Sequence, residues 1–216
     1  MAPPRPLALA CVVGILLLAA GPRPAGSHDP PRDRESRDLD PRLARNPSLA
    51  VIRPAPDFRL LDVTGGVASL SELRGRVVLL SFTYASCPSA CPLITQRMAM
   101  LQRGLREARL LPSRVNLLSI TVDPERDSAA SLGRYARGFG ADPEGWRFLR
   151  EAPERLGPVL GAYDEWTVHR PGGDIDHPAR LHLIDREGRV REIYSLALFD
   201  ERQAFLDILA LLREPR

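Results

Sequence analysis

Hydrophobic and polar positions between residues 57 and 213 switch repeatedly between the pattern of strands and that of amphipathic helices. Two apolar runs, at 76–84 and 114–123, predict buried strands. Two late segments on either side of Glu187-Gly188 predict a hairpin. The remaining expected elements are a hairpin that begins at 58–62 and turns near Gly65-Gly66, a helical turn at 69–73, a short strand at 146–149, late strands at 180–185 and 189–194, and helices at 92–111, 128–139, 153–163 and 200–213.

The helical segments carry an apolar stripe each. In the first helix the stripe is expected to contain Leu93, Met98, Leu101 and Leu105, and in the last helix Phe205, Leu206, Leu209 and Leu212. Asp127 or Ser128 is expected to cap the helix at 128–139. The order of elements, with two strand–helix–strand units followed by a hairpin and a helix, predicts one α/β domain over residues 57–213: a thioredoxin-like, three-layer α/β/α sandwich with an N-terminal β-hairpin.

The N-terminal quarter of the chain has a different composition. Residues 7–20 are apolar between Arg5 and Arg23, so we expect 1–21 to be a signal or a membrane anchor that directs export to a bacterial periplasm. Fourteen helical residues span roughly 21 Å, less than a bilayer core of about 30 Å, which favours the apolar core of a signal segment. No clean cleavage site follows, so we expect the segment to anchor the chain to the inner membrane, with a cleaved signal peptide as the alternative. Residues 22–56 hold eight prolines, seven arginines and no aromatic residue, as expected of a flexible tether.

Charge and cysteine content exclude some functions. The 30 basic residues are all arginine and are interspersed with 27 acidic residues, for a net charge of +3, so no basic stripe for nucleic acid is expected. Three cysteines are too few for a disulfide-rich scaffold. Cys11 lies within the apolar leader and is expected to be an apolar filler, which leaves one pair of thiols in the folded domain.

That pair, Cys87 and Cys91, lies in the stretch LLSFTYASCPSACPLITQRM, where a buried strand passes into a helix. Pro92 stands at an early helical position, where proline is tolerated. Amides at a helix start favour thiolate, which attacks disulfides and binds soft metals. The pair could be a structural disulfide, a redox couple or part of a metal site, and a disulfide closing so small a loop would stabilise the fold little.

A metal site needs a third ligand, and histidine is the obvious candidate. His28 falls in the tether, His169 is expected to be an exposed polar residue and His182 a strand-face residue. His177 differs, because it lies in a loop that feeds a late strand and can return over the strand–helix junction, with Asp176 beside it to orient the imidazole. Two thiolates and one imidazole form a soft, roughly trigonal set that suits copper, Cu(I) in particular, whereas zinc would require a fourth ligand.

Three motifs, FTYASCPSACP, TVDPERD and DIDH before a strand ending in LID, together resemble the Sco/SenC family. The resemblance runs from Pro56 to about residue 210. It implies a thioredoxin-like fold that binds one copper ion, Cu(I) or Cu(II), through Cys87, Cys91 and His177. It also implies a role in assembling the dinuclear copper site of cytochrome c oxidase subunit II, as a copper donor, as a thiol reductant of the receiving cysteines, or both. The expected partners are that subunit and a periplasmic copper chaperone or thioredoxin-like reductant, with the chain itself a monomer.

Other functions fit the same residues. A periplasmic thiol–disulfide oxidoreductase would use Cys87 and Cys91 as its redox pair without any need for His177, and a copper or redox sensor is a further possibility. No peroxidatic T-x-x-C motif is present, since Thr83 lies four residues from Cys87. Asp123 and Asp127 match an acidic segment of the family, but turn formation or helix capping explains them at least as well. Pro178 departs from the family pattern and stiffens the loop after His177.

Overall fold

The computed structural model describes residues 47–215 and contains every predicted strand and helix in the predicted order. The strands are β1 (Arg53–Pro54), β2 (Arg59–Asp62), β3 (Val67–Ser69), β4 (Val77–Thr83), β5 (Val115–Thr121), β6 (Trp146–Arg150), β7 (Val168–His169), β8 (Ile175–Asp176), β9 (Arg180–Ile184) and β10 (Arg189–Ser195). The helices are the 3-10 turn η1 (Ser71–Leu73) and the α-helices α1 (Ala90–Glu107), α2 (Ala129–Gly138), α3 (Pro153–Ala162) and α4 (Glu201–Arg213).

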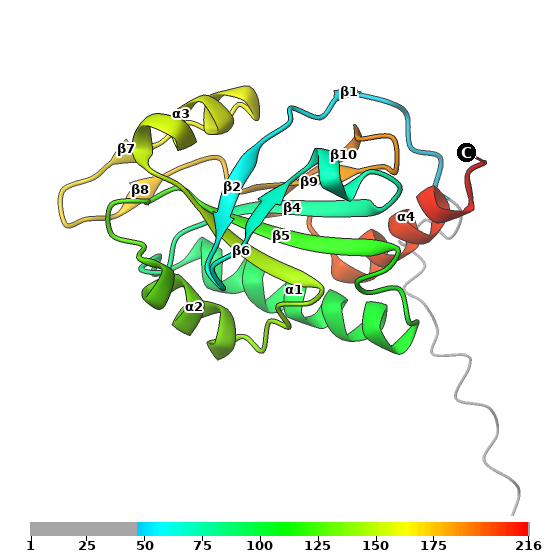
Figure 1. Cartoon of the computed structure of the whole chain (residues 1–216), viewed down its shortest axis with the longest axis horizontal. Helices are drawn as coiled ribbons and strands as arrows, with labels where there is room; N and C mark the ends of the chain where they lie inside the picture. The colour runs from blue at the N-terminus through cyan, green and yellow to red at the C-terminus, as the bar shows by residue number, and fades with distance from the viewer. Residues whose placement is uncertain (1–46, 216) are drawn as a thin grey trace, which may run out of the picture. The chain divides into compact units, whose positions relative to one another are not determined.

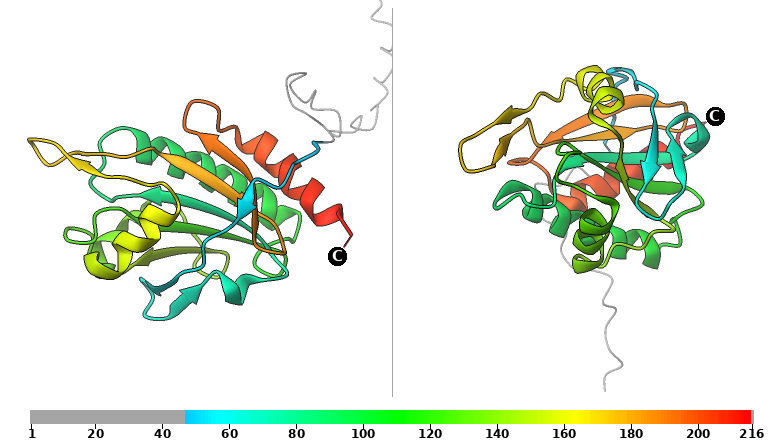
Figure 2. Two further views of the ribbon diagram at one scale, coloured as in Figure 1. Left: turned by 90° about the horizontal axis from the view of Figure 1, so that it is seen from above. Right: turned by 60° about the vertical axis from the view of Figure 1, so that its left-hand side comes forward.

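A mixed sheet in the order β1-β10-β9-β4-β5-β6-β2-β3 forms the middle layer (Figure 1). The central strands β4, β5 and β6 are parallel, because α1 and α2 cross over between them, and the outer strands pair antiparallel. Every residue of β4 and β5 is buried, as expected for parallel strands covered on both faces. Helices α1, α2 and α4 lie on one face and α3 on the other (Figures 1 and 2). The predicted three-layer, thioredoxin-like architecture is confirmed.

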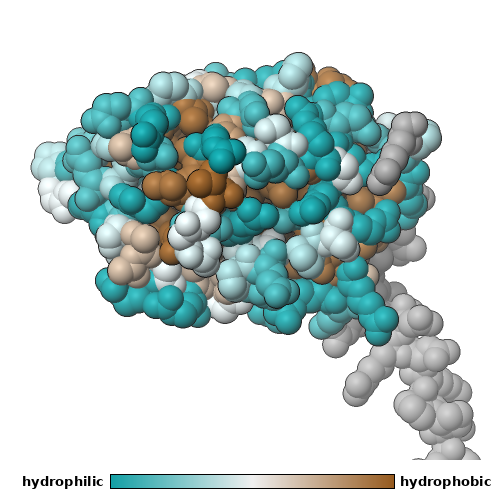
Figure 3. Space-filling view, viewed as in Figure 1, coloured by the Kyte–Doolittle hydropathy of each residue, from teal (hydrophilic) through white to brown (hydrophobic). Residues whose placement is uncertain are grey.

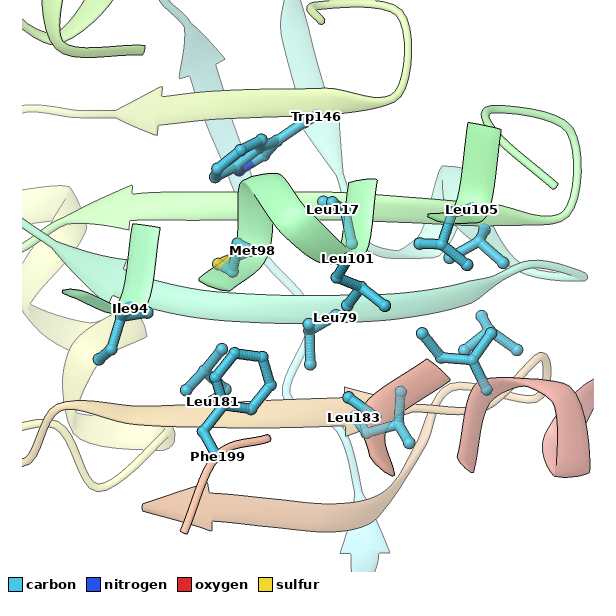
Figure 4. Packing of buried hydrophobic residues seen from close by; sticks show 14 of the residues in the cluster. Leu79, Ile94, Met98, Leu101, Leu105, Leu117, Trp146, Leu181, Leu183 and Phe199 are labelled. Atoms are coloured by element: carbon cyan, nitrogen blue, oxygen red, sulfur yellow. The ribbon is translucent and has the colours of Figure 1, made fainter. Parts of the chain in front are cut away.

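The larger core lies between the sheet and the face covered by α1 and α4. Side chains of α1, including Ile94, Met98 and Leu101, meet Leu79 of β4 and Leu117 of β5 (Figure 4). The second core lies under α3 and the N-terminal hairpin, and it includes both Cys87 and Cys91. The cysteine pair is therefore held at the edge of a packed core rather than on a free loop.

Two predicted apolar stripes were partly wrong. Leu93 is 47% exposed, and its neighbour Ile94 is buried in its place, because successive helical residues point about 100° apart. In α4 the buried positions include Ala204, Ile208 and Leu211, together with the predicted Leu212. The predicted Phe205, Leu206 and Leu209 are only half-buried.

The segment before β2 already contacts the domain. β1 pairs with β10, the Ala55 side chain is buried, and the backbone oxygen of Leu49 accepts a hydrogen bond from the Arg191 guanidinium at 3.1 Å. These contacts fall within the C-terminal part of the range predicted as a tether, 22–56. The predicted leader at 1–21, Cys11, His28 and the tether up to residue 46 lie outside the described residues, so the domain boundaries remain predictions.

Within residues 47–215, no helix combines the length and apolar character needed to cross a bilayer. The face seen in Figure 3 is largely hydrophilic, with a hydrophobic area toward the left of the view and smaller ones elsewhere.

Candidate metal and thiol site

The two cysteines lie at the carboxyl end of β4. Cys87 is in the loop that leaves the strand, and Cys91 is the second residue of α1, with Pro92 directly after it. Both thiols are free, and the backbone N–H of Cys91 donates to the Cys87 sulfur at 3.3 Å. Cys87 is 8% exposed and Cys91 only 1%. Cys87 is thus the more accessible thiol and receives a donor from the start of the helix.

The two thiols differ in acidity. The Cys91 thiol is the largest influence that lowers the pKa of Cys87, to about 5, and the N–H groups of Cys91 and Ser89 add to this effect while burial opposes it. The same contact with Cys87, together with burial, raises the pKa of Cys91. The Cys91 thiol, helped by the amides at the helix start, therefore favours a thiolate on Cys87 rather than on Cys91. This asymmetry is typical of a nucleophilic thiol paired with a resolving thiol.

His177 reaches the pair from the loop between β8 and β9. Its Nε2 lies 3.8 Å from the Cys91 sulfur, although 86 residues separate them in sequence. A thiolate at about 2.3 Å and an imidazole nitrogen at about 2.0 Å from one metal ion, 120° apart, would be about 3.7 Å from each other. The observed separation therefore fits two donors of a shared ion. Among the described residues, no group of three or more Cys, His, Asp or Glu side chains is already gathered as a closed metal cluster.

Tyr84 fixes the loop that carries His177. Its hydroxyl accepts from the N–H of Ile175 at 3.1 Å and donates to the Ile175 carbonyl at 3.3 Å. Its ring meets the imidazole of His177 edge-on, with centroids 6.0 Å apart. Because Tyr84 directly follows β4, it ties the segment before His177 to the same strand end that carries the cysteines.

Glu165 lies behind His177. Its side chain is fully buried, with Oε2 3.6 Å from His177 Nδ1 and Oε1 3.4 Å from the Arg180 guanidinium. Oε1 is also 4.0 Å from Nε2 of His182. Burial alone would raise the pKa of Glu165, but His177, His182 and Arg180 outweigh burial and hold this pKa below its usual value. The buried carboxyl group is therefore ionised at neutral pH.

The other predicted residues have different surroundings. Asp176, expected to orient His177, instead pairs with Arg170, its Oδ2 2.6 Å from the Arg170 Nε. His169 is exposed and His182 is a buried strand-face residue of β9, as predicted.

The acidic segment supports the cysteine loop. The Asp127 carboxylate accepts from the Ala85 N–H at 3.1 Å and from the Thr121 hydroxyl at 2.6 Å, and burial raises its pKa. Ser128, not Asp127, caps α2, by accepting from the Ser131 N–H. Asp123 pairs with Arg126 at 2.5 Å. Asp127 therefore anchors the backbone just before Cys87.

A cavity of about 350 Å³ opens over the site. Its lining includes Tyr84, Cys87, Trp166 and His177. Cys91 is not part of this lining, which agrees with its deeper burial. A molecule entering the cavity would therefore meet Cys87 and His177 first.

The sequence patterns did not single out two residues of the site, Tyr84 and Glu165. Tyr84 lies within the motif FTYASCPSACP, so its closeness to the cysteines could have drawn attention to it. Glu165 carries no such signal, since a glutamate between a helix and a polar loop is normally exposed.

Comparison with known proteins identifies the family of this chain. A family model described as SCO1/SenC matches residues 50–213. The mitochondrial SCO2 homolog of Bos taurus is 33% identical over 146 residues, which cover 65% of this chain and 53% of that protein. The chain spans about half the length of the first curated relatives it matches.

Solved structures share the fold. Bradyrhizobium japonicum ScoI, solved with copper bound, is 28% identical with a TM-score of 0.63, and the match covers 73% of this chain and 99% of that one. BsSco is described as a member of the Sco family of cytochrome c oxidase assembly proteins with a disulfide switch. Its structure matches with a TM-score of 0.67 at 22% identity, over 78% of this chain and 100% of that one. At this identity the match supports the fold alone. With a family model that covers most of its length, the chain belongs to the SCO1/SenC family.

Proposed function

We propose that this chain binds one copper ion through Cys87, Cys91 and His177 and delivers it to the dinuclear copper site of cytochrome c oxidase subunit II. The observation that carries the proposal is the 3.8 Å separation between Cys91 Sγ and His177 Nε2, next to a second thiol. Two thiolates and an imidazole suit Cu(I). Membership of the SCO1/SenC family and the copper-bound ScoI of Bradyrhizobium japonicum support the same reading.

The arrangement suits a cargo that must leave again. Three donors leave one side of the ion open, and the cavity lined by Cys87 and His177 gives an incoming thiolate access to that side. An acceptor thiolate can therefore join the ion before the first donor leaves. Binding requires both cysteines reduced and deprotonated, so protons and copper compete for them.

The same thiols can act as a reductant. The Cys87 thiolate would attack one sulfur of an acceptor disulfide, forming a mixed disulfide and releasing the other acceptor sulfur as a thiolate. Cys91, after losing its proton, would then attack Cys87, so that the chain is oxidised to a disulfide and the acceptor becomes a dithiol. The low pKa of Cys87 and the buried position of Cys91 favour this second activity, which is the alternative to copper transfer.

We also propose that delivery takes place on the outer face of the bacterial inner membrane, in the periplasm, with residues 1–21 as anchor or signal. This placement rests on the apolar leader and on the expected partner.

One experiment separates copper transfer from thiol reduction. The reduced full chain, loaded with one Cu(I), is mixed anaerobically with the reduced copper-binding domain of an oxidase subunit II, and copper is counted on each protein after separation. We expect the ion on the acceptor, and we expect His177→Ala to lose copper retention and transfer while still reducing a disulfide substrate. A His177→Ala variant that retains and transfers copper like the wild type would contradict the three-donor proposal.

A further inference from the structure

The Nδ1 atom of His177 has two neighbours that make opposite demands on it. The backbone N–H of Ala179 lies 3.3 Å away and donates to Nδ1, which requires that Nδ1 carry no hydrogen. Glu165 Oε2 lies 3.6 Å away, just beyond hydrogen-bond distance, and as a carboxylate oxygen it can only accept, so a hydrogen bond between the two would need a hydrogen on Nδ1. A neutral imidazole carries one hydrogen on its two nitrogens, so the stronger of the two neighbours decides which nitrogen holds that hydrogen.

The choice decides whether Nε2 can bind a metal. With the hydrogen on Nδ1, the lone pair of Nε2 faces the Cys91 sulfur and is free to coordinate. With the hydrogen on Nε2, that nitrogen is a donor toward the sulfur and cannot be a ligand until the hydrogen moves. The tautomer therefore sets whether the third donor is ready before the ion arrives.

The surroundings of Glu165 favour the hydrogen on Nδ1. Within the described part of the chain, Oε2 has no hydrogen-bond partner and its side chain is fully buried. The Arg180 guanidinium approaches Oε1 instead and supplies the positive charge that a buried carboxylate needs. A buried acceptor left unpaired is costly, and a hydrogen bond to an ionised acceptor is roughly twice as strong as one between neutral groups.

We propose that Glu165 is a positioning residue that holds His177 in the Nδ1–H tautomer and so keeps Nε2 ready for copper beside Cys91. This role rests on the proposed function and goes beyond the three donors. Sequence neighbours do not supply it, because Asp176, the adjacent acid, is paired with Arg170. Ligating histidines commonly pass their second N–H to a carboxylate, and loss of that carboxylate lowers metal affinity about 10- to 100-fold.

Without Glu165, the Ala179 amide becomes the stronger partner of Nδ1. The ring hydrogen then moves to Nε2, by exchange with water and with no net gain or loss of protons. The imidazole keeps its place against the Tyr84 ring, but copper must first displace the hydrogen from Nε2. The expected result is a weaker site in a chain that is otherwise folded.

The test is the tautomer of His177, read from the nitrogen-15 shifts and couplings of its ring in the reduced, metal-free full chain. Variants are Glu165→Met, which removes the acceptor and keeps an apolar side chain of similar length, and Glu165→Gln, which keeps a neutral acceptor. Asp176→Asn is the matched control, since it removes the neighbouring acid. We expect Nδ1–H in the wild type and in the control, Nε2–H in Glu165→Met, and a mixture in Glu165→Gln.

Copper affinity gives the second readout. Competition with a Cu(I) chelator is expected to show a 10- to 100-fold loss for Glu165→Met and a change of less than about twofold for Asp176→Asn. A wild type with the hydrogen on Nε2, or a Glu165→Met variant that keeps it on Nδ1, would overturn the proposal. The wild-type tautomer alone decides the matter if Glu165→Met fails to fold. If the wild type binds no copper, the proposed function is overturned, but the tautomer measurement still reports whether Glu165 positions His177.

Discussion

The hydroxyl of Tyr84 is expected to stabilise both the fold and the site. It makes two hydrogen bonds to the backbone of Ile175, which is 5% exposed and leads directly to the loop carrying His177. Tyr84→Phe removes both bonds and keeps the ring that packs against the imidazole. The substitution therefore isolates the hydroxyl from the aromatic contact.

The expected loss of stability follows from the hydrogen bonds that are removed and the backbone groups that lose their partner. A typical hydrogen bond contributes about 1 kcal/mol net, and a buried group left without a partner costs about 1–3 kcal/mol. Two buried backbone groups of Ile175 lose their partner, so we expect the free energy of unfolding to fall by about 2–3 kcal/mol. Because the loop before His177 loses its tie to β4, copper retention should also weaken.

Urea unfolding of the reduced, metal-free chain measures the change as a lower midpoint with an unchanged slope. Tyr163→Phe is the control, because its hydroxyl donates to the Pro56 carbonyl at 2.7 Å, a contact away from the cysteines. We expect that control to cost about 1 kcal/mol and to leave copper retention intact. A Tyr84→Phe variant as stable as the wild type, or one that retains copper as well as Tyr163→Phe does, would contradict this role of the Tyr84 hydroxyl.

Three further outcomes are expected. In the reduced, metal-free chain, iodoacetamide should modify Cys87 first, with a rate that falls as pH drops through about 5; a midpoint near 9.0 would contradict the lowered pKa. Burial would raise the pKa of Asp185, but the N–H of Arg189 and the nearby guanidinium groups outweigh burial and lower this pKa. The ionised Asp185 carboxylate therefore stabilises the fold above its unfolded pKa, and this stability is lost as the pH falls toward the folded pKa. Urea titrations from pH 5 to pH 3 should therefore show a steeper loss of stability for the wild type than for Asp185→Asn. Ile94→Ala should cost about 2–5 kcal/mol and Leu93→Ala less than about 0.5 kcal/mol; equal costs would contradict the observed helix face.

Local pattern predicted most of the fold because each main element carries its own signal. The continuous apolar runs of β4 and β5 and the turn between β9 and β10 needed no tertiary information. The two-residue strands β1, β7 and β8 were not predicted, since so short a segment has no periodicity. The inward face of α1 was only partly right because Leu93 and Ile94 are adjacent and equally apolar.

The site residues likewise differ in how much of their role a local sequence pattern can predict. The cysteine pair could be identified as a candidate site from the sequence, because it lies at a predicted strand–helix junction. His177 needed the resemblance as well, because its approach to Cys91 depends on a fold that joins residues 86 positions apart. Glu165 could not be predicted, because its burial depends on how the loop after α3 packs against β9, where Arg180 and His182 approach its carboxylate.

Copper stoichiometry shows whether Cys87, Cys91 and His177 bind one copper ion together. The reduced full chain and its His177→Ala variant would be exposed to Cu(I) and, separately, Cu(II) without oxygen, and retained copper would be counted after desalting. We expect one copper per wild-type chain and little or none in the variant. No copper on the wild type, or equal copper on both, would contradict shared binding by the three residues and leave a thiol–disulfide oxidoreductase as the better description.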